Sequence, residues 1–328
     1  MDAGMDEHSF TLAVAPPFRL DLTVWALRRR PENRTDRWDG QFYRRALPLG
    51  PQGGLIGLAV RQGQSGHAGQ PELQVSLTGA GAGQARLGAQ LALRRMLGLE
   101  VDLSDFYRLA EGDAMLGPLA RQFRGFRPPR FPSVFETLAN AISCQQITLS
   151  LGITLLNRLI AAHGQVHPAA AAGESGPDAL NAFPTPEDLA EAPPETLRPL
   201  GFSGQKARYL TELAGAVAAG ELDLETLAAL DNAEAAARLR QLRGVGRWTA
   251  EYALLRGLGR LDTFPGDDAG ARNGLQRWLG LTEKLDYDGV QRIVGRWQPY
   301  AGLVYFHLLL ASLDKRGVIG EMAPVAGD

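Results

Sequence analysis

The sequence predicts a mainly α-helical protein with an N-terminal α+β domain, and three observations lead to this fold class. Between Phe10 and Thr78, short runs of alternating hydrophobic and polar residues are separated by glycine and proline, as in strands joined by turns. After Val101 the hydrophobic residues recur at helical spacing instead. A Gly-x-Gly turn, from Gly244 to Gly246, then separates two of the helical stretches.

The N-terminal domain is expected to cover residues 1–104 and to contain a small antiparallel sheet. Residues 54–60 and 73–77 have the alternating pattern of half-buried strands. A helix over residues 84–97 follows them. Its hydrophobic face is expected to contain Leu87, Leu91 and Met96.

Residues 105–328 are expected to form a helical region of two subdomains. One start signal is clear, because Thr185 is a good N-cap and Pro186 follows it at the first helical position. We expect residues 167–177 to be a flexible surface loop and the residues after Val318 to be a loose tail. The predicted helices span residues 135–163, 185–191, 206–219, 231–242, 247–255 and 303–313.

Length and composition favour a globular protein of two or three domains, since 328 residues with 45% hydrophobic residues can bury a large core. No hydrophobic run is long enough to cross a bilayer. The acidic segment Met1 to Glu7 lacks the apolar region of a signal peptide. We therefore expect neither secretion nor membrane insertion, and a protein of the cytoplasm.

The single cysteine, Cys144, excludes an internal disulfide, a four-cysteine iron–sulfur cluster and a four-cysteine zinc site. We expect it to be a small buried residue and not a nucleophile, because no histidine lies near it in the sequence.

The arginines are distributed unevenly, although the net charge of −2 argues against a broad basic surface for nonspecific nucleic-acid binding. Arg243 and Arg247 flank the hairpin glycines and could hold a few phosphates. The cluster from Arg28 to Arg30 is expected to be a solvated surface. Four further arginines form a run without an acidic residue, namely Arg121, Arg124, Arg127 and Arg130.

Two helices joined by a tight turn are predicted over residues 233–256. Asp231 or Asn232 is a suitable N-cap for the first helix, and Glu234 stands at the N3 position if Asp231 holds the cap.

The turn of this hairpin contains Gly244 and Gly246, which are expected to adopt positive backbone dihedrals at little cost. The second helix then begins at Arg247 with free N–H groups and the positive end of its dipole, a suitable binding site for phosphate. A purely structural turn between two helices would also use glycine, so both interpretations are open at this point.

A proline- and glycine-containing loop over residues 264–268 follows the hairpin and ends in Asp267 and Asp268. It offers a carboxylate next to whatever the hairpin binds. Carboxylates are also common at helix starts, so either aspartate could simply cap the helix that follows.

The hairpin motif over residues 242–250 and the loop ending in Asp268 resemble the helix-hairpin-helix DNA glycosylase superfamily, and most of all its 3-methyladenine DNA glycosylase II family. The resemblance covers nearly the whole chain. It implies a helix-hairpin-helix DNA glycosylase fold with the active site in a cleft between two helical domains. Further similar segments are residues 16–18, 41–45, 141–148 and 296–300.

The resemblance assigns the catalytic role to Asp268, with Arg272 on the helix that starts there, and leaves capping to Asp267. Cleavage of an N-glycosidic bond builds positive charge on the sugar, which a desolvated carboxylate stabilises. Asp268 could also orient or deprotonate the attacking water. A base alkylated on a ring nitrogen is already cationic and leaves without an acid, so one carboxylate suffices.

Position 248 indicates the reaction type, because bifunctional members of the superfamily carry a nucleophilic lysine where this chain has Trp248. We therefore expect an abasic product without strand cleavage. Trp248 and Tyr252 lie four residues apart and could stack on an extruded, cationic base, or they could be ordinary core residues. Gln145 and Gln146 match the loop that fills the gap left by the flipped nucleotide, or they form a polar helix cap.

Other implied roles concern the DNA backbone and a bound ion. No organic cofactor is implied, but the backbone carbonyls of Arg240, Leu242 and Val245 are expected to hold a monovalent cation, sodium or potassium. The DNA contacts that the resemblance assigns are Gln145, Gln146, Gly244, Gly246, Arg247, Thr249 and Arg272.

Three positions of the expected base pocket differ from the family pattern. Ala269 and Gly270 stand where relatives carry an aromatic and an aliphatic residue, and Leu309 stands in place of a tryptophan. Each change removes volume, so we expect a wider and less aromatic pocket.

The sequence thus predicts a monomeric, monofunctional glycosylase of base excision repair that acts on alkylated bases in double-stranded DNA. Its product would pass to abasic-site repair enzymes. Two alternatives are open, a catalytically weak protein that binds DNA lesions and a glycosylase for oxidised or deaminated bases.

Overall fold

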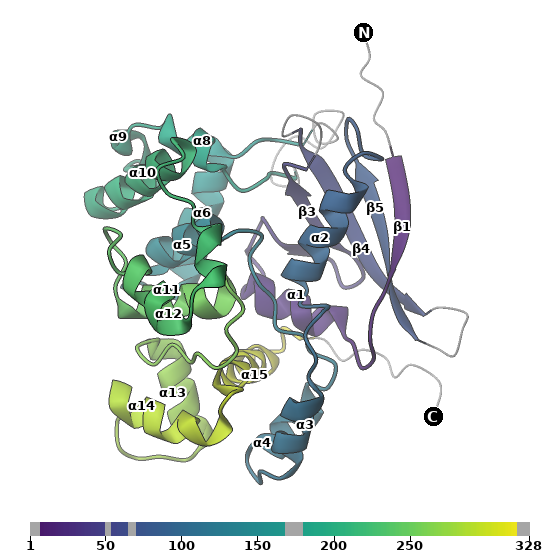
Figure 1. Cartoon of the computed structure of the whole chain (residues 1–328), viewed down its shortest axis with the longest axis vertical. Helices are drawn as coiled ribbons and strands as arrows, with labels where there is room; N and C mark the ends of the chain where they lie inside the picture. The colour runs from purple at the N-terminus through teal and green to yellow at the C-terminus, as the bar shows by residue number, and fades with distance from the viewer. Residues whose placement is uncertain (1–6, 50–53, 65–69, 168–179, 320–328) are drawn as a thin grey trace.

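The computed structural model describes residues 7–49, 54–64, 70–167 and 180–319, and it confirms a mainly helical fold with an N-terminal sheet (Figure 1). All neighbouring strands are antiparallel, in the order β1-β5-β4-β3-β2. The strands are β1 (Glu7–Ala13), β2 (Arg37–Trp38), β3 (Tyr43–Leu47), β4 (Ile56–Gln64) and β5 (Pro71–Thr78).

Two helices, α1 (Leu20–Arg28) and α2 (Arg86–Met96), contribute to the apolar core of the sheet. The sequence did not predict α1, although all nine of its residues are buried. A helix buried all round has no polar face, so it lacks the amphipathic pattern by which helices are recognised. From α1 and α2 the core of the sheet receives Leu20, Val24, Leu27, Ala89, Leu93 and Met96.

The predicted buried face of α2 was wrong for two of its three residues. Leu87 is 67% exposed and Leu91 is 61% exposed, whereas Met96 is buried as expected. The sheet instead contacts the helix face that carries Ala89 and Leu93, where a small alanine allows close approach.

The remaining helices form two helical cores, which we call the first and the second helical core (Figure 1). The first contains α5 (Val134–Cys144), α6 (Leu149–His163), α8 (Pro186–Ala190), α9 (Pro194–Leu197), α10 (Gly204–Ala218), α11 (Asn232–Leu239), α12 (Arg247–Arg256) and the short 3₁₀ helix Glu225–Ala229. The second contains α3 (Ser104–Glu111), α4 (Leu116–Gln122), α13 (Ala269–Trp278), α14 (Tyr287–Val294), the 3₁₀ helix Gly295–Trp297 and α15 (Ala301–Asp314).

The second helical core also includes residues from the N-terminal part of the chain. Trp25 and Ala26 of α1 are buried in it, and α1 contacts α15. The division of the chain at residues 104 and 105 stays a prediction, and α1 joins its two sides.

Several helix boundaries follow the predicted caps. The side chain of Thr185 accepts a hydrogen bond from the backbone of Asp188, whose carboxylate accepts one in return, with Pro186 at the start of the helix. Asp231 caps α11 by accepting a hydrogen bond from the backbone of Glu234 at 2.8 Å.

The predicted single helix over residues 135–163 is instead two helices. Gln145 ends α5 in an extended conformation, and Gln146 has a φ of 55° in the left-handed region. Thr148 then caps α6 by accepting a hydrogen bond from the backbone of Leu151 at 3.3 Å. The break turns the segment between the helices into a loop.

The expected solvated cluster from Arg28 to Arg30 is wrong for its first two residues. Arg28 is 5% exposed and donates to the carbonyls of Trp38 and Pro31, at 3.0 and 2.6 Å. Arg29 is 4% exposed and has a left-handed φ of 64°. For Arg28, the hydrogen bonds to fixed backbone carbonyls compensate the free-energy cost of burying its positive charge.

The run of arginines between residues 121 and 130 is not one basic surface either. Arg121 and Arg124 are exposed, but Arg127 is buried and donates to the carbonyls of Ala15, at 2.9 Å, and Val101. Arg127 therefore connects chain segments and does not face solvent.

A buried ion network joins the sheet to α5. Arg45, on β3, is fully buried and lies 2.7 Å from Asp36 and 2.5 Å from Glu136. Burial by itself would lower the pKa of Arg45, but the two carboxylates raise that pKa well above its usual value. This network fixes α5 relative to the N-terminal sheet.

Two predicted segments fall outside the described residues, the loop from residue 168 to 177 and the tail from residue 320. His167, where that loop was expected to begin, is buried, and its Nε2 donates to the carbonyl of Thr78 at 2.9 Å. Among the described residues, no helix is both long and apolar enough to span a membrane.

Candidate active site

Asp268 lies where the two helical cores meet and is held by three hydrogen bonds. It caps α13, because its Oδ1 accepts a hydrogen bond from the backbone N–H of Ala271 at 2.9 Å. Its Oδ2 accepts one from Trp248 Nε1 and one from the Tyr305 hydroxyl, each at 3.2 Å. A carboxylate has about four lone-pair positions, so one acceptor position, on Oδ1, is left for a ligand. Capping by Asp268 therefore leaves one acceptor position open for a ligand.

The loop before Asp268 is fastened to α12 through Glu251. One carboxylate oxygen of Glu251 accepts a hydrogen bond from the Gly266 backbone at 3.2 Å, and the other accepts one from the Tyr287 hydroxyl at 2.6 Å. A side chain at position 266 would meet the Tyr287 ring at 2.8 Å, so this close approach requires glycine. Burial raises the pKa of the Glu251 carboxyl.

Asp267 is not the N-cap of α13, contrary to the interpretation that assigned capping to it. Its carboxylate accepts a hydrogen bond from Arg247 Nε at 2.7 Å. The hydrogen bond that Arg247 donates to Asp267 raises the pKa of Arg247, whose guanidinium also lies 3.6 Å from the centre of the Tyr287 ring. This partly exposed pair joins the hairpin to the loop of Asp268.

The hairpin turn uses its two glycines differently. Gly244 has a φ of +81°, and a side chain there would approach the Tyr209 ring to 2.3 Å. Gly246 has a φ of −89° and a ψ of −175°, an extended conformation open to any residue. The expected positive dihedral at Gly246 was therefore wrong. A Cβ added at Gly246 would meet no described atom within 4 Å, so the glycine leaves the start of α12 uncovered.

Gln145 connects the loop between α5 and α6 to this turn. Its Nε2 donates to the carbonyl of Gly244 at 2.7 Å and to the hydroxyl of Thr249 at 2.9 Å. Lys206 holds the same loop by donating to the carbonyl of Gln145 at 2.7 Å. Gln146 is exposed at the tip of the loop, so of the two glutamines it is the one that faces solvent. The side chain of Thr249 is buried and not at the surface.

The aromatic pair of α12 has one member at the site and one behind it. The rings of Trp248 and Tyr252 lie 5.5 Å apart and are tilted by 39°. Trp248 is half-buried and donates to Asp268, whereas Tyr252 is 3% exposed and packs against Phe131. The Tyr252 hydroxyl accepts a hydrogen bond from Arg29 at 2.9 Å. The core interpretation therefore fits Tyr252, and Trp248 is the ring next to the carboxylate.

Two residues of this region were missed from the sequence, Tyr305 and Arg29. Tyr305 is on α15 and reaches Asp268 across 37 positions of sequence, so no local pattern connects them. Arg29 also donates to Asn140 at 2.7 Å, which places the N-terminal part of the chain directly behind the aromatic pair. Only the tertiary arrangement brings these side chains together.

The remaining positions of the expected base pocket lie around the start of α13 and along α15. Ala269 and Gly270 are exposed in the first turn of α13, and a side chain at Gly270 would lie 3.2 Å from Asp268 Oδ1. Leu309 is half-buried, one helical turn after Tyr305. Arg272 is half-buried, and its backbone N–H donates to the carbonyl of Asp268 at 2.8 Å.

The expected cation site consists of backbone groups only. The carbonyl of Leu242 accepts the backbone N–H of Val245 at 3.1 Å and keeps a second lone pair, so its donor chemistry fits a monovalent cation. Among the described residues, no group of three or more histidine, cysteine, aspartate or glutamate side chains could hold a metal ion. Cys144 is half-buried, and burial raises the pKa of its thiol, as expected for a structural residue.

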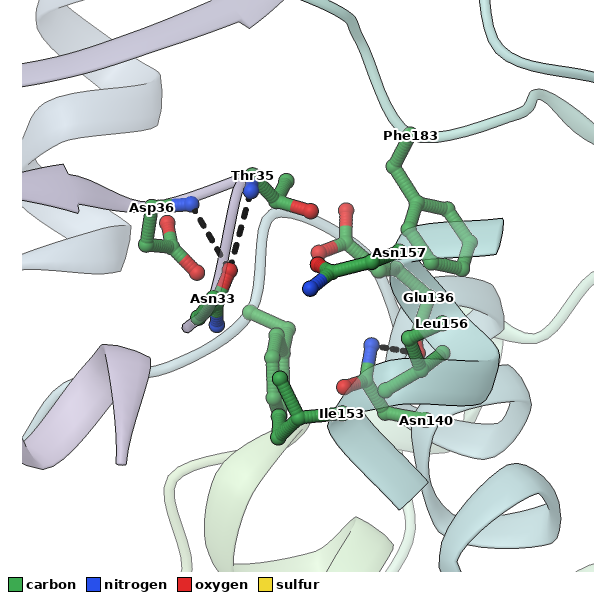
Figure 2. Close-up of a pocket in the computed structure, with 10 residues that line it drawn as sticks. Asn33, Thr35, Asp36, Glu136, Asn140, Ile153, Leu156, Asn157 and Phe183 are labelled. Atoms are coloured by element: carbon green, nitrogen blue, oxygen red, sulfur yellow. Dashed lines mark hydrogen bonds between the residues drawn. The ribbon is translucent and has the colours of Figure 1, made fainter. Parts of the chain in front are cut away.

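A small cavity lined by both polar and apolar side chains lies between the N-terminal part and helices α5 and α6, and Asp268 is not among the residues that line it (Figure 2). Asn33 accepts hydrogen bonds there from the backbones of Thr35 and Asp36, at 2.9 and 3.1 Å. The wall also contains Glu136, whose carboxylate is already paired with Arg45. Its polar groups serve the junction between domains, and none of the predicted site residues lines it.

A helix-hairpin-helix next to one anchored carboxylate is the arrangement of a DNA glycosylase. Residues 139–299 match the family model described as "HhH-GPD superfamily base excision DNA repair protein". The chain belongs to this HhH-GPD superfamily, and it is a base excision DNA repair glycosylase.

Individual relatives agree with this assignment. DNA-3-methyladenine glycosylase 2 of Escherichia coli is 28% identical over 91% of this chain and 96% of its own length. DNA-3-methyladenine glycosylase 1 of Schizosaccharomyces pombe is 32% identical over 54% of this chain and 71% of its own. A solved structure, the 3-methyladenine DNA glycosylase of Archaeoglobus fulgidus, superposes with a TM-score of 0.74 at 27% identity, covering 93% of this chain and 98% of that one.

Proposed function

We propose that this protein is a monofunctional DNA glycosylase that removes alkylated bases, such as 3-methyladenine and 7-methylguanine, and leaves an abasic site. The observation that carries the proposal is the Asp268 carboxylate, which is anchored by three donors next to the indole of Trp248. The names of the relatives in Escherichia coli and Schizosaccharomyces pombe support the same substrate class.

Asp268 acts as a fixed anion. As the bond between base and sugar lengthens, positive charge develops on the sugar, and a nearby carboxylate stabilises it more strongly than it stabilises the ground state. Three hydrogen bonds fix the orientation of this carboxylate before the reaction begins. The open acceptor position on Oδ1 can hold the attacking water.

The surroundings of Asp268 favour bases that leave without being protonated. Burial and the Asp268 charge raise the pKa of Tyr305 well above its usual value, so this phenol is a poor acid. The Glu251 carboxylate accepts hydrogen bonds from the Tyr287 hydroxyl and the Gly266 backbone, so it holds the loop in place. A cationic alkylated base needs no acid, whereas a neutral base does.

The lysines of the chain support hydrolysis without strand cleavage. The sequence contains only three, and position 248 is a tryptophan. Lys206 donates to the carbonyls of Ser143 and Gln145, and Lys284 and Lys315 are exposed. A Schiff base with the sugar requires an amine at the reacting carbon, and Trp248 cannot supply one.

The DNA backbone is bound at the start of α12, where Gly246 leaves the N–H groups uncovered. Arg247 uses Nε for Asp267 and keeps its terminal N–H groups for a phosphate. Trp248 stacks on the extruded base, and a positively charged base gains a cation–π contribution. Gln146, at the exposed tip of its loop, occupies the space from which the nucleotide has moved. A monovalent cation on the carbonyls of Arg240, Leu242 and Val245 would stiffen the hairpin.

The functional partner is thus damaged double-stranded DNA, bound by a monomer, and the abasic product passes to enzymes that process such sites. The test is release of free base from methylated duplex DNA, followed by chromatography of the soluble products. The proposal predicts free 3-methyladenine and 7-methylguanine, and strand breaks only after alkali treatment. Binding without base release would indicate a lesion-binding protein. Release of oxidised or deaminated bases alone would indicate the other substrate class.

A further inference from the structure

Tyr305 contacts the carboxylate that the proposed chemistry uses, and it comes from a different helical core than the other side chain that does so. Its hydroxyl donates to Asp268 Oδ2 at 3.2 Å, and the indole of Trp248 donates to the same oxygen at the same distance. Trp248 is in the first turn of α12, while Tyr305 is on α15. The two donors therefore hold the carboxylate between the two helical cores.

The position of the Tyr305 ring is fixed independently of Asp268. The side chain is 9% exposed, and its ring meets the edge of Phe264 with centres 5.7 Å apart and an angle of 84°. Phe264 begins the loop that ends in Asp268, so Tyr305 packs against one end of that loop and donates to the other. Because the ring is packed in place, its hydroxyl is held in a fixed position next to Asp268.

The hydroxyl itself is chemically suited to be a permanent donor. A buried hydroxyl without a partner costs free energy, and phenylalanine would fill the same space without this cost. Arg256 and Arg29 are the charged groups that oppose Asp268 around the phenol, and the phenol nevertheless keeps its proton because burial and the carboxylate raise its pKa. A charged acceptor makes the hydrogen bond stronger than a neutral one would.

We propose that Tyr305 is the positioning residue of the proposed glycosylase reaction, which fixes the plane of the Asp268 carboxylate so that its remaining acceptor position on Oδ1 faces the reacting sugar. Tyr305 itself touches neither base nor sugar. Without its hydrogen bond, the carboxylate keeps the Ala271 donor on Oδ1 and the Trp248 donor on Oδ2, so its plane is held less firmly and the open position on Oδ1 is less well directed. The inference depends on the proposed function, because it assigns a role toward the same carboxylate.

The test uses Tyr305→Phe, which removes the hydroxyl and keeps the ring against Phe264. Single-turnover excision of 7-methylguanine is measured over a range of enzyme concentrations. The maximal rate should fall about tenfold, the size expected for loss of a hydrogen bond to a charged group, while the concentration for half-saturation stays unchanged. Tyr300→Phe is the matched control, since Tyr300 lies at the start of the same helix and its ring contacts Phe106 at 5.9 Å. Its rate should equal that of the wild type.

A double variant separates positioning from general stability. In an Asp268→Asn background, Tyr305→Phe should cause no further loss, because the two residues act as one unit. An equal tenfold loss in both backgrounds, or a maximal rate of Tyr305→Phe within twofold of the wild type, would overturn the inference. Failure of the proposed function would look different, since the wild-type protein itself would then release no methylated base.

Discussion

The side-chain amide of Gln145 donates to the carbonyl of Gly244 at 2.7 Å and so ties the loop after α5 to the turn of the hairpin. The same nitrogen donates to Thr249, which is buried in the first turn of α12. Two segments that the resemblance assigns to DNA binding are thus one unit. The stability of this unit and its proposed contact with DNA depend on different side chains, which variants can separate.

Gln145→Ala should lower the free energy of unfolding by about 1–3 kcal/mol, because the carbonyl of Gly244 and the hydroxyl of Thr249 lose a donor in a partly buried place. Urea unfolding measures this change. Gln146→Ala is the control, and it should leave stability within about 0.5 kcal/mol of the wild type while slowing excision. The opposite pattern, with Gln146→Ala less stable and Gln145→Ala unaffected, would contradict the assignment.

Gly246→Val should weaken binding to all duplexes alike, damaged or undamaged, with little change in stability. Its backbone conformation suits valine and a Cβ there meets no described atom within 4 Å, so the new side chain should cover the proposed phosphate site without disturbing the fold. Gel-shift assays at one salt concentration provide the measurement. Normal binding by this variant would make the hairpin a purely structural turn.

Gly244→Ala tests the other glycine and, unlike Gly246→Val, should lower the stability of the fold. A side chain at Gly244 would approach the Tyr209 ring to 2.3 Å from a backbone with a φ of +81°, so the free energy of unfolding should fall by more than about 1 kcal/mol. Thermal unfolding measures the change. Wild-type stability in this variant would show that the turn tolerates a side chain.

Leu309→Trp tests the wider pocket that Ala269, Gly270 and Leu309 suggest. A larger ring one turn after Tyr305 should slow excision of bulky or poorly fitting alkylated bases more than excision of 3-methyladenine. Single-turnover rates on a panel of single-lesion duplexes provide the comparison. Equal changes across the panel would mean that Leu309 does not face the base.

The buried His307 is expected to make the second helical core less stable at acidic pH. Burial lowers the pKa of His307 to about 4 from 6.5, and its Nδ1 donates to the carbonyl of Leu303 at 2.7 Å. In the unfolded chain His307 binds a proton below pH 6.5, whereas in the folded chain it does so only near pH 4. Burial of the neutral imidazole is therefore compatible with full stability above pH 6.5 and costs stability below it. About 3 kcal/mol should be lost as the pH falls between these values. His307→Leu should flatten this part of the stability curve in urea unfolding, and an unchanged curve would contradict the prediction.

Local signals in the sequence were sufficient for part of the fold. Asp231 caps α11 as expected, because the bond from its carboxylate to the backbone of Glu234 depends only on neighbours. The buried face of α2 was misjudged at Leu87 and Leu91, because a run of apolar residues does not tell which of them meets a sheet formed elsewhere. Which face of a helix packs against the sheet is decided by tertiary packing and not by the local sequence.

The candidate site divides in the same way. The loop with Asp268 could be found from its motif, but only the structure shows that Asp268 caps α13 and that Asp267 pairs with Arg247. From its neighbours in the sequence, Arg29 is expected to be a solvated residue. Its burial is explained only by its hydrogen bonds to Tyr252 and Asn140, which are far away in the sequence. When donors come from separate helices and strands, their positions in the sequence show no regular spacing by which the site could be recognised.

The central claim is that Asp268 carries the chemistry, and Asp268→Asn tests it most directly. The substitution keeps the shape of the side chain and removes its charge, so several kcal/mol of transition-state stabilisation should be lost while DNA affinity is retained. The measurement is single-turnover release of 3-methyladenine from methylated duplex, with Asp267→Asn as the matched control. We expect a loss of at least about a hundredfold for Asp268→Asn and near-normal release for Asp267→Asn. Near-normal release by Asp268→Asn would contradict the central claim.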